Sequence, residues 1–149
     1  MTQGWAVREE HDRADAARYG QLLEAARTSF TEFGYGLTTI AEITRRAGVS
    51  RATFYVSFAS TEHVFAVLAE QVRVLLAALA ARPGFVDGEV GSAPDEPGLW
   101  ALVTRWEGVG SYRRALSAYE VKLAGGPVWV HAVDEPGVYL TAADLGAEA

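Results

Sequence analysis

The apolar residues in the first half of the chain recur at helical spacing. A stripe at i, i+4, i+8 and i+11 predicts a helix over about residues 13–33, and it consists of Leu22, Ala26, Phe30 and Phe33. Gly34 is a natural end for this helix, because glycine tolerates the left-handed conformation that follows many helices. A second stripe predicts a longer helix ending at Pro83, and it consists of Val64, Phe65, Leu68, Val72, Leu75, Leu76 and Leu79.

Two short helices are predicted between the long ones. Thr39 and Glu42 have the spacing of a capping box, in which a threonine hydroxyl accepts from the third backbone amide and a glutamate returns to the cap. Gly48 interrupts this helix, and Ser50 supplies a fresh N-cap for a helix that runs to Phe58. The apolar residues spaced to bury inward from this segment are Ile40, Ile43, Val49 and Phe54.

The chain changes character near Arg82-Pro83, since all five prolines lie at or after that point. We therefore expect a first domain over residues 13–82 and a second over residues 83–149. Two more helices are predicted in the second domain from helical stripes, one on Leu99, Leu102, Val103 and Trp106 and one on Tyr112, Leu116, Tyr119 and Leu123.

The last part of the chain is the most irregular. The sequence Gly-Gly-Pro at residues 125–127 breaks the helical pattern, residues 128–133 are β-prone, and residues 138–140 resemble a weak return strand. The predicted fold class is all-α: an N-terminal three-helix helix-turn-helix domain plus a long connecting helix, followed by a reduced, partly irregular helical C-terminal region.

Composition excludes several kinds of site. The chain has no cysteine, which rules out disulfides and cysteine-ligated zinc, and its three histidines show no ligand spacing, so we predict no metal and no cofactor. We find no defensible pair of nucleophile and base, and predict no enzyme. The N-terminus lacks the apolar core of a secretory signal, and no stretch reaches the ~18 uninterrupted apolar residues of a membrane span. We therefore expect a cytoplasmic protein that has no contact with a membrane.

Charge is distributed unevenly. The formal net charge is −6, and it comes entirely from residues 83–149. Between Thr38 and Phe58 three arginines, at positions 45, 46 and 51, stand against one glutamate, at position 42, so this segment is positive. A nucleic-acid phosphate responds to such local charge, since distant charges are screened.

A helix, a glycine-containing turn and a capped short helix are the parts of a helix-turn-helix that places its second helix in the major groove of DNA. Arg51 and Thr53 are the candidates for base-edge contact, and Thr38, Thr39, Tyr55 and Ser57 are candidates for the phosphate backbone. The remaining members of the predicted DNA-binding set are Arg45, Arg46, Ser50, Ala52 and Val56.

The segment from Arg18 to Val72 resembles the N-terminal domain of the TetR family of bacterial transcriptional repressors. The resemblance rests on Phe30-x-x-Phe33-Gly34-Tyr35, Thr38-Thr39-Ile40, Ala47-Gly48-Val49-Ser50 and Phe54-Tyr55-x-x-Phe58. It implies a homodimer that binds an operator in double-stranded DNA and represses transcription until a small-molecule effector enters the C-terminal domain.

Three positions depart from the family pattern. Ser57 stands where His or Tyr is usual, Val56 where an aromatic or basic residue is frequent, and Thr61 where a phosphate-binding Lys is common. Each departure removes a DNA contact that the resemblance would imply, so we expect weakened binding.

An alternative interpretation is a helical protein-interaction module, or a truncated regulator, that has lost strong DNA binding. The acidic second domain favours this alternative. Residues 125–149 do not look like the dimer-forming helices that the resemblance implies, which suggests a truncation or a shifted reading frame.

Overall fold

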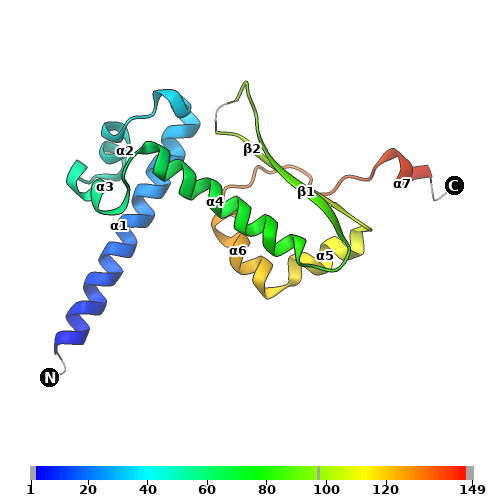
Figure 1. Cartoon of the computed structure of the whole chain (residues 1–149), viewed down its shortest axis with the longest axis horizontal. Coiled ribbons are helices and arrows are strands. Elements are labelled where there is room, and N and C mark those ends of the chain that lie inside the picture. Colours follow the sequence, from blue (N-terminus) through cyan, green and yellow to red (C-terminus); the bar gives the residue numbers. More distant parts are fainter. Residues whose placement is uncertain (1–2, 97, 147–149) are drawn as a thin grey trace. The chain divides into compact units, whose positions relative to one another are not determined.

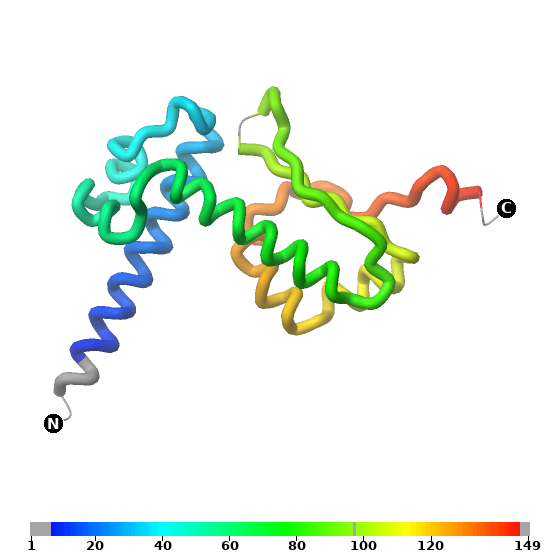
Figure 2. The backbone as a smooth tube through the Cα atoms, in the orientation of Figure 1, coloured from blue at the N-terminus to red at the C-terminus, as the bar shows by residue number. Residues whose placement is uncertain are grey.

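The computed structural model describes residues 3–96 and 98–146. Figure 1 labels the elements, and Figure 2 follows the backbone in the same orientation. The helices are α1 (Gln3–Phe33), the 3-10 helix η1 (Tyr35–Leu37), α2 (Ile40–Ala47), α3 (Arg51–Ser57), α4 (Thr61–Ala80), α5 (Val109–Ser117), α6 (Tyr119–Trp129) and α7 (Ala142–Gly146). The strands are β1 (Phe85–Ser92) and β2 (Trp100–Trp106).

The chain forms two compact units. The N-terminal unit comprises Met1–Glu70 together with Val90–Leu102, and the C-terminal unit comprises Gln71–Glu89 together with Val103–Ala149. Helix α4 and the two strands therefore contribute residues to both units.

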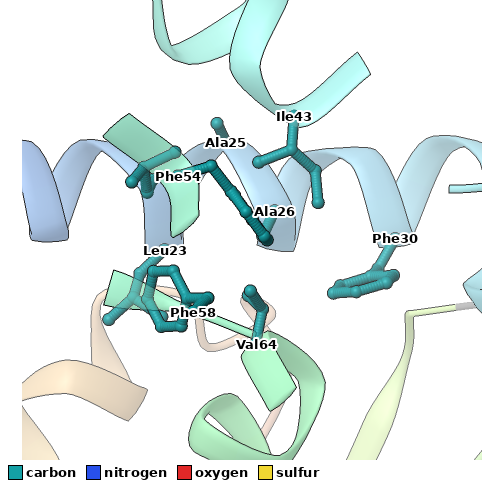
Figure 3. Close-up of a cluster of buried hydrophobic side chains, with 9 residues drawn as sticks. Leu23, Ala25, Ala26, Phe30, Ile43, Phe54, Phe58 and Val64 are labelled. Carbon is teal, nitrogen blue, oxygen red and sulfur yellow. The ribbon is translucent and has the colours of Figure 1, made fainter. Parts of the chain in front are cut away.

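The core of the N-terminal unit confirms three of the four positions in the stripe predicted for the first helix, whereas the fourth, Phe33, is 44% exposed at the end of α1. Leu22, Ala26 and Phe30 of α1 are buried together with residues of α2, α3 and α4, among them Ile43, Phe54, Phe58 and Val64 (Figure 3). Ile40 and Val49 pack against this core while partly exposed. The helices are thus held by apolar burial on one face of each, as the spacing predicts.

Helix α1 begins ten residues before the predicted start at residue 13. This extension contains few apolar residues, but its Glu9 lies 3.4 Å from Arg13 at helical spacing, and Arg18 lies 3.0 Å from Asp15 further along the same helix. Pairs at i, i+3 and i, i+4 support an exposed helix by a few tenths of a kcal/mol each, about 0.2–0.5.

The fold class predicted from the sequence is wrong in one respect, because the chain is not all-α. Strands β1 and β2 pair in a two-stranded sheet. The amide of Glu107 bonds to the carbonyl of Gly84 at 2.8 Å and the amide of Ala93 to that of Leu99 at 3.0 Å, which makes the strands antiparallel. The stripe of Leu99, Leu102, Val103 and Trp106 that predicts a helix therefore lies at the end of the hairpin turn and in β2.

The reason is that this segment satisfies two periodicities at once. In β2 the half-buried side chains are Leu102, Thr104 and Trp106, which alternate with exposed neighbours in the period of two of a strand. The Trp106 indole donates to the Thr104 hydroxyl at 2.9 Å along this face. Threonine, valine and tryptophan favour strands, and the partner strand β1 supplies the pairing that the sequence pattern does not reveal.

Three further predictions in the second half are corrected. The stripe from Tyr112 to Leu123 is divided between α5 and α6, because Ala118 adopts an extended conformation with φ −67° and ψ 138°. Gly-Gly-Pro does not break the pattern, since α6 continues through Pro127 to Trp129. The β-prone residues 128–133 and 138–140 form no strand in the part of the chain that is described.

Close packing explains two of the glycines. A Cβ at Gly88 of β1 would lie 2.8 Å from Leu76 Cδ1 of α4, so the absence of a side chain lets the hairpin approach the helix. A Cβ at Gly125 would lie 2.3 Å from the ring of Trp129, which folds back over the glycine one turn earlier. The buried apolar residues of the C-terminal unit are Leu75, Leu79, Ala115 and Val121.

Among the described helices, α4 is long and apolar enough to cross a membrane. In its most apolar stretch of 18 residues, 17% is buried. Its first turn carries Glu62, and Val64 lies fully buried in the core of the N-terminal unit. A single helix of this kind is weak evidence for a membrane span, and its buried Val64, Leu75 and Leu79 belong to the folded units.

Phe54 is fully buried, whereas Val56 on the same short helix is 85% exposed. Phe54→Ala should therefore lower the free energy of unfolding by about 3–5 kcal/mol, since it removes a ring from a packed core. Urea or thermal denaturation followed by circular dichroism measures this loss.

Val56→Ala is the matched control, and it should change stability by less than about 0.5 kcal/mol. Equal destabilisation by the two substitutions would contradict the orientation of α3.

Candidate nucleic-acid interface

Local capping fixes the two short helices and the turn between them. Thr39 Oγ1 accepts from the Glu42 amide at 3.2 Å, and Ser50 Oγ accepts from the Thr53 amide at 3.1 Å, as predicted for the two N-caps. Gly48 has φ 68°, a left-handed conformation, and its amide bonds to the Arg45 carbonyl at 3.3 Å. A residue with a side chain would be strained there, so the glycine is required by the turn.

Two aromatic anchors determine which way α3 faces. Phe54 is 0% and Phe58 1% exposed, and their rings lie 5.6 Å apart in the core against α1. Helical geometry then turns the opposite side of α3 to solvent. The exposed residues on that side are Arg51, Ala52, Tyr55 and Val56, at i, i+1, i+4 and i+5. We call these four residues the α3 outer face.

The two small polar residues of α3, Thr53 and Ser57, are both half-buried. The Thr53 hydroxyl lies 3.0 Å from that of Ser50, which also caps the helix. Ser57 lies at the last turn. The hydrogen-bonding capacity left on the α3 outer face is therefore that of Arg51 and the Tyr55 hydroxyl.

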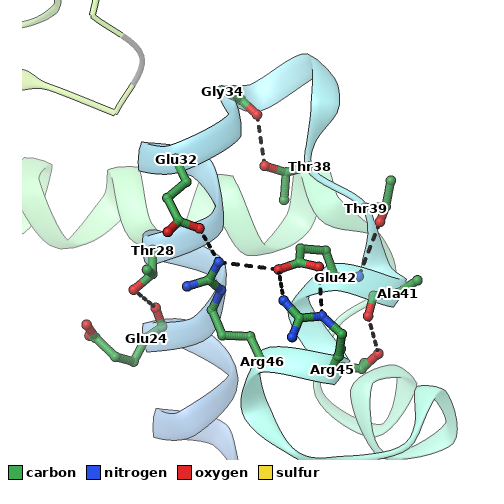
Figure 4. A network of polar contacts seen from close by, with 11 residues as sticks. Glu24, Thr28, Glu32, Gly34, Thr38, Thr39, Ala41, Glu42, Arg45 and Arg46 are labelled. Atoms are coloured by element: carbon green, nitrogen blue, oxygen red, sulfur yellow. Dashed lines mark hydrogen bonds and ion pairs between the residues drawn. The ribbon is translucent and has the colours of Figure 1, made fainter.

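Arg45 and Arg46 of α2 belong to an ion-pair network (Figure 4). Arg45 donates to the Glu42 carboxylate at 2.6 and 3.0 Å, and Arg46 donates to the same carboxylate at 3.3 Å. Arg46 also pairs with Glu32 of α1. The Glu42 side chain thus engages the arginines, and the structure gives no return bond from it to the Thr39 cap.

The network compensates the charge that the sequence assigns to this segment. The hydrogen bond from Arg45 is the largest cause that lowers the pKa of Glu42, and the same pair raises the pKa of Arg45. The carboxylate of Glu42 is therefore charged at neutral pH, and its pairing is lost only as the pH falls through its lowered pKa. Arg51 remains as a cation with no ion pair among the described residues.

Thr38 and Thr39 have different surroundings. Thr38 is buried, and its hydroxyl donates to the Gly34 carbonyl at 2.8 Å, which closes the connection between α1 and α2. Thr39 is exposed at the start of α2. The geometry leaves Thr39 accessible to a phosphate and gives Thr38 a structural role.

Similarity to known protein sequences agrees with this arrangement of α2 and α3. The sequence model of the family described as bacterial regulatory proteins, tetR family, matches residues 22–68. These residues form a TetR-family domain. They span α2, α3 and the parts of α1 and α4 that supply their core.

Several curated relatives share this part of the chain. The HTH-type transcriptional repressor Rv1474c of Mycobacterium tuberculosis is 32% identical over 83 residues, which cover 54% of this chain and 44% of the relative. The uncharacterized HTH-type transcriptional regulator Rv2250c of the same species is 43% identical over 56 residues, which cover 38% of this chain and 29% of the relative. The uncharacterized HTH-type transcriptional regulator YfiR of Bacillus subtilis is 42% identical over 48 residues, which cover 32% of this chain and 23% of the relative. The chain thus matches less than half the length of each, and no solved structure matches it.

Three residues that support the TetR-family domain were not found from the sequence. Tyr19 stacks on Phe58 with ring centroids 5.0 Å apart, and His63 meets the same ring at 5.7 Å while its Nδ1 accepts from the Ala59 amide. Glu32 neutralises Arg46 from another helix. The contacts of Tyr19 and Glu32 join elements that are distant along the chain, so no local sequence pattern signals them.

Glu42→Gln should release Arg45 in the TetR-family domain and leave Arg46 paired with Glu32 alone. We expect tighter binding to random-sequence duplex DNA and a steeper dependence of log K on log salt, by about 0.9 for each phosphate newly neutralised. Fluorescence anisotropy at several salt concentrations measures both quantities.

Glu9→Gln is the control, because it removes the same charge and an arginine pair on the exposed part of α1. If both variants change the slope equally, net charge alone is responsible and the specific role of the Glu42 network is excluded.

Proposed function

We propose that this protein is a DNA-binding transcriptional regulator that reads operator DNA through the α3 outer face. The observation that carries the proposal is the orientation of α3, which the buried Phe54 and Phe58 anchor so that Arg51 and Tyr55 face solvent. The match of residues 22–68 to the family described as bacterial regulatory proteins supports it. Regulation by DNA binding requires no catalytic group, so we propose no enzymatic activity, and we place the protein in the cytoplasm.

We further propose that the protein represses transcription and acts as a homodimer. One relative is named a transcriptional repressor, which supports repression rather than activation. Helix α6 offers a surface for a second copy, because Tyr119, Leu123 and Val130 are 75%, 67% and 76% exposed and follow one another on one side of the helix. Contiguous exposed apolar side chains of this kind are typical of protein interfaces.

We also propose that a small effector molecule relieves the repression. In the C-terminal unit the rings of Phe85 and Trp106 lie 5.3 Å apart, and those of Trp106 and Tyr112 lie 5.9 Å apart. Effector sites are lined mainly by apolar and aromatic groups, so we propose this cluster as the place where an apolar effector binds.

The proposal is tested by titrating the protein against random-sequence duplexes and duplexes from neighbouring promoters at two salt concentrations, with light scattering on the same sample. A dimer that binds one promoter duplex more tightly, and all duplexes less tightly at high salt, is expected. Arg51→Ala should weaken binding to the preferred duplex by about 1–3 kcal/mol, as for loss of a bidentate base contact.

Arg113→Ala on α5 removes the same charge from an exposed site in the other unit and serves as the control. A monomer without salt-sensitive DNA binding would contradict the proposal and favour the protein-interaction module. Unchanged affinity in Arg51→Ala would exclude Arg51 from the interface.

Thr61→Lys provides a gain-of-function test at the start of α4. Thr61 is half-buried, with its hydroxyl 3.4 Å from the Glu62 carboxylate, and it stands where the family resemblance implies a phosphate-binding lysine. The pKa of Glu62 is lowered, mainly by a hydrogen bond from its own backbone amide, so a negative charge persists at this helix end. A lysine should raise DNA affinity and steepen the salt slope by about 0.9.

Ala17→Lys adds the same charge on the exposed part of α1 and controls for net charge. If both lysines have the same effect, the start of α4 is not a phosphate contact.

A further inference from the structure

The α3 outer face is mainly apolar. Ala52 and Val56 lie four residues apart and therefore on the same side of the helix, with Tyr55 beside them. Val56 is 85% exposed and Tyr55 57% exposed. The only cation on this face is Arg51. A single exposed valine is ordinary on a protein surface, but here the apolar groups occupy the side of the helix that is proposed to enter the groove.

The other polar groups near this face already have partners within the protein. The hydroxyls of Ser50 and Thr53 lie 3.0 Å apart, and Ser50 also caps the helix at 3.1 Å. Arg45 and Arg46 are held by Glu42 and Glu32. A helix with this surface can form few direct hydrogen bonds to base edges.

Double-stranded DNA presents one apolar group in the major groove, the 5-methyl group of thymine, which distinguishes thymine from the other three standard bases. A valine side chain and an alanine methyl one turn apart match such a group by burying it from water. We propose that Val56, flanked by Ala52, reads the 5-methyl group of a thymine in the operator. This inference rests on the proposed function and assigns to these residues a role in base specificity.

The contact should be modest in strength and sharply located. Burying one methyl group corresponds to about a fourfold change in affinity. Replacement of thymidine by deoxyuridine removes that methyl group and leaves the Watson–Crick pairing intact. Sensitivity to deoxyuridine should therefore be confined to the thymine positions that Val56 touches in each half of the operator.

The experiment begins with the duplex that the wild-type protein selects from a random pool. Each thymidine of that duplex is replaced in turn by deoxyuridine, and affinities are measured for the wild type, Val56→Ala and Val56→Ile. We expect a loss of about fourfold at one thymine position per half-site for the wild type, a similar loss for Val56→Ile, and none for Val56→Ala.

Val7→Ala is the matched control, because Val7 is a 63% exposed valine on the extended part of α1. It should keep the full deoxyuridine sensitivity. Circular dichroism of all variants checks that the fold is intact, which the exposure of Val56 favours.

The other outcomes overturn the inference in distinguishable ways. The wild type could bind its selected duplex with an affinity that no deoxyuridine replacement changes, or Val56→Ala could lose as much affinity as the wild type on deoxyuridine replacement. Either result would show that Val56 does not read thymine, while the proposed function would stand. If no duplex is enriched and binding is not salt-sensitive, the proposed function fails and the inference fails with it.

Discussion

The arrangement of the N-terminal unit depends on the burial of Phe54 and Phe58. Helix α3 has seven residues, well below the ~12–15 at which an isolated helix becomes marginally stable in water. Its conformation must therefore come from packing, and the two rings supply it by entering the core built on α1. Because they lie on one side of α3, they also decide which residues face outward. Stability of the domain and the identity of the α3 outer face thus have the same physical cause.

The same packing sets the electrostatics of the region. Bringing α2 against α1 places Arg46 beside Glu32, while Glu42 pairs with both arginines of its own helix. Counting charges along the sequence overestimates the positive charge available to a phosphate, because Glu32 lies outside the counted segment. If the protein binds DNA as proposed, its affinity would then depend more on contacts to base edges than on neutralised phosphates.

Much of the N-terminal domain could be predicted because its signals are local. The caps at Thr39 and Ser50 and the turn at Gly48 each involve residues within a few positions of one another, and the structure confirms them. The pairing of Glu32 with Arg46 and the stacking of Tyr19 on Phe58 join residues that are distant along the chain. No pattern of spacing reports such contacts. The assignments of individual residues to DNA contacts remain predictions.

The hairpin shows why the second half was harder to predict. Leu102, Val103 and Trp106 fit a helical stripe, yet Leu102 and Trp106 also fit a strand, and the choice depends on β1 as a partner. Pro127 was expected to end a helix, but α6 accommodates it two residues before its end, where Trp129 packs over Gly125. In both cases a tertiary contact overrides the local preference.

Helix α4 and the hairpin are the two stretches of chain that belong to both compact units. Within the N-terminal unit they meet, because Trp100 of β2 packs on Phe65 of α4 with ring centroids 5.5 Å apart. Phe65 in turn contacts Phe30 at 5.5 Å, and Phe30 belongs to the core that holds α3. A displacement of either α4 or the hairpin would therefore act on the same cluster of aromatic rings, Phe30, Phe65 and Trp100. Within the N-terminal unit, the Phe30–Phe65–Trp100 contacts thus join α4 and the hairpin to the core that holds α3.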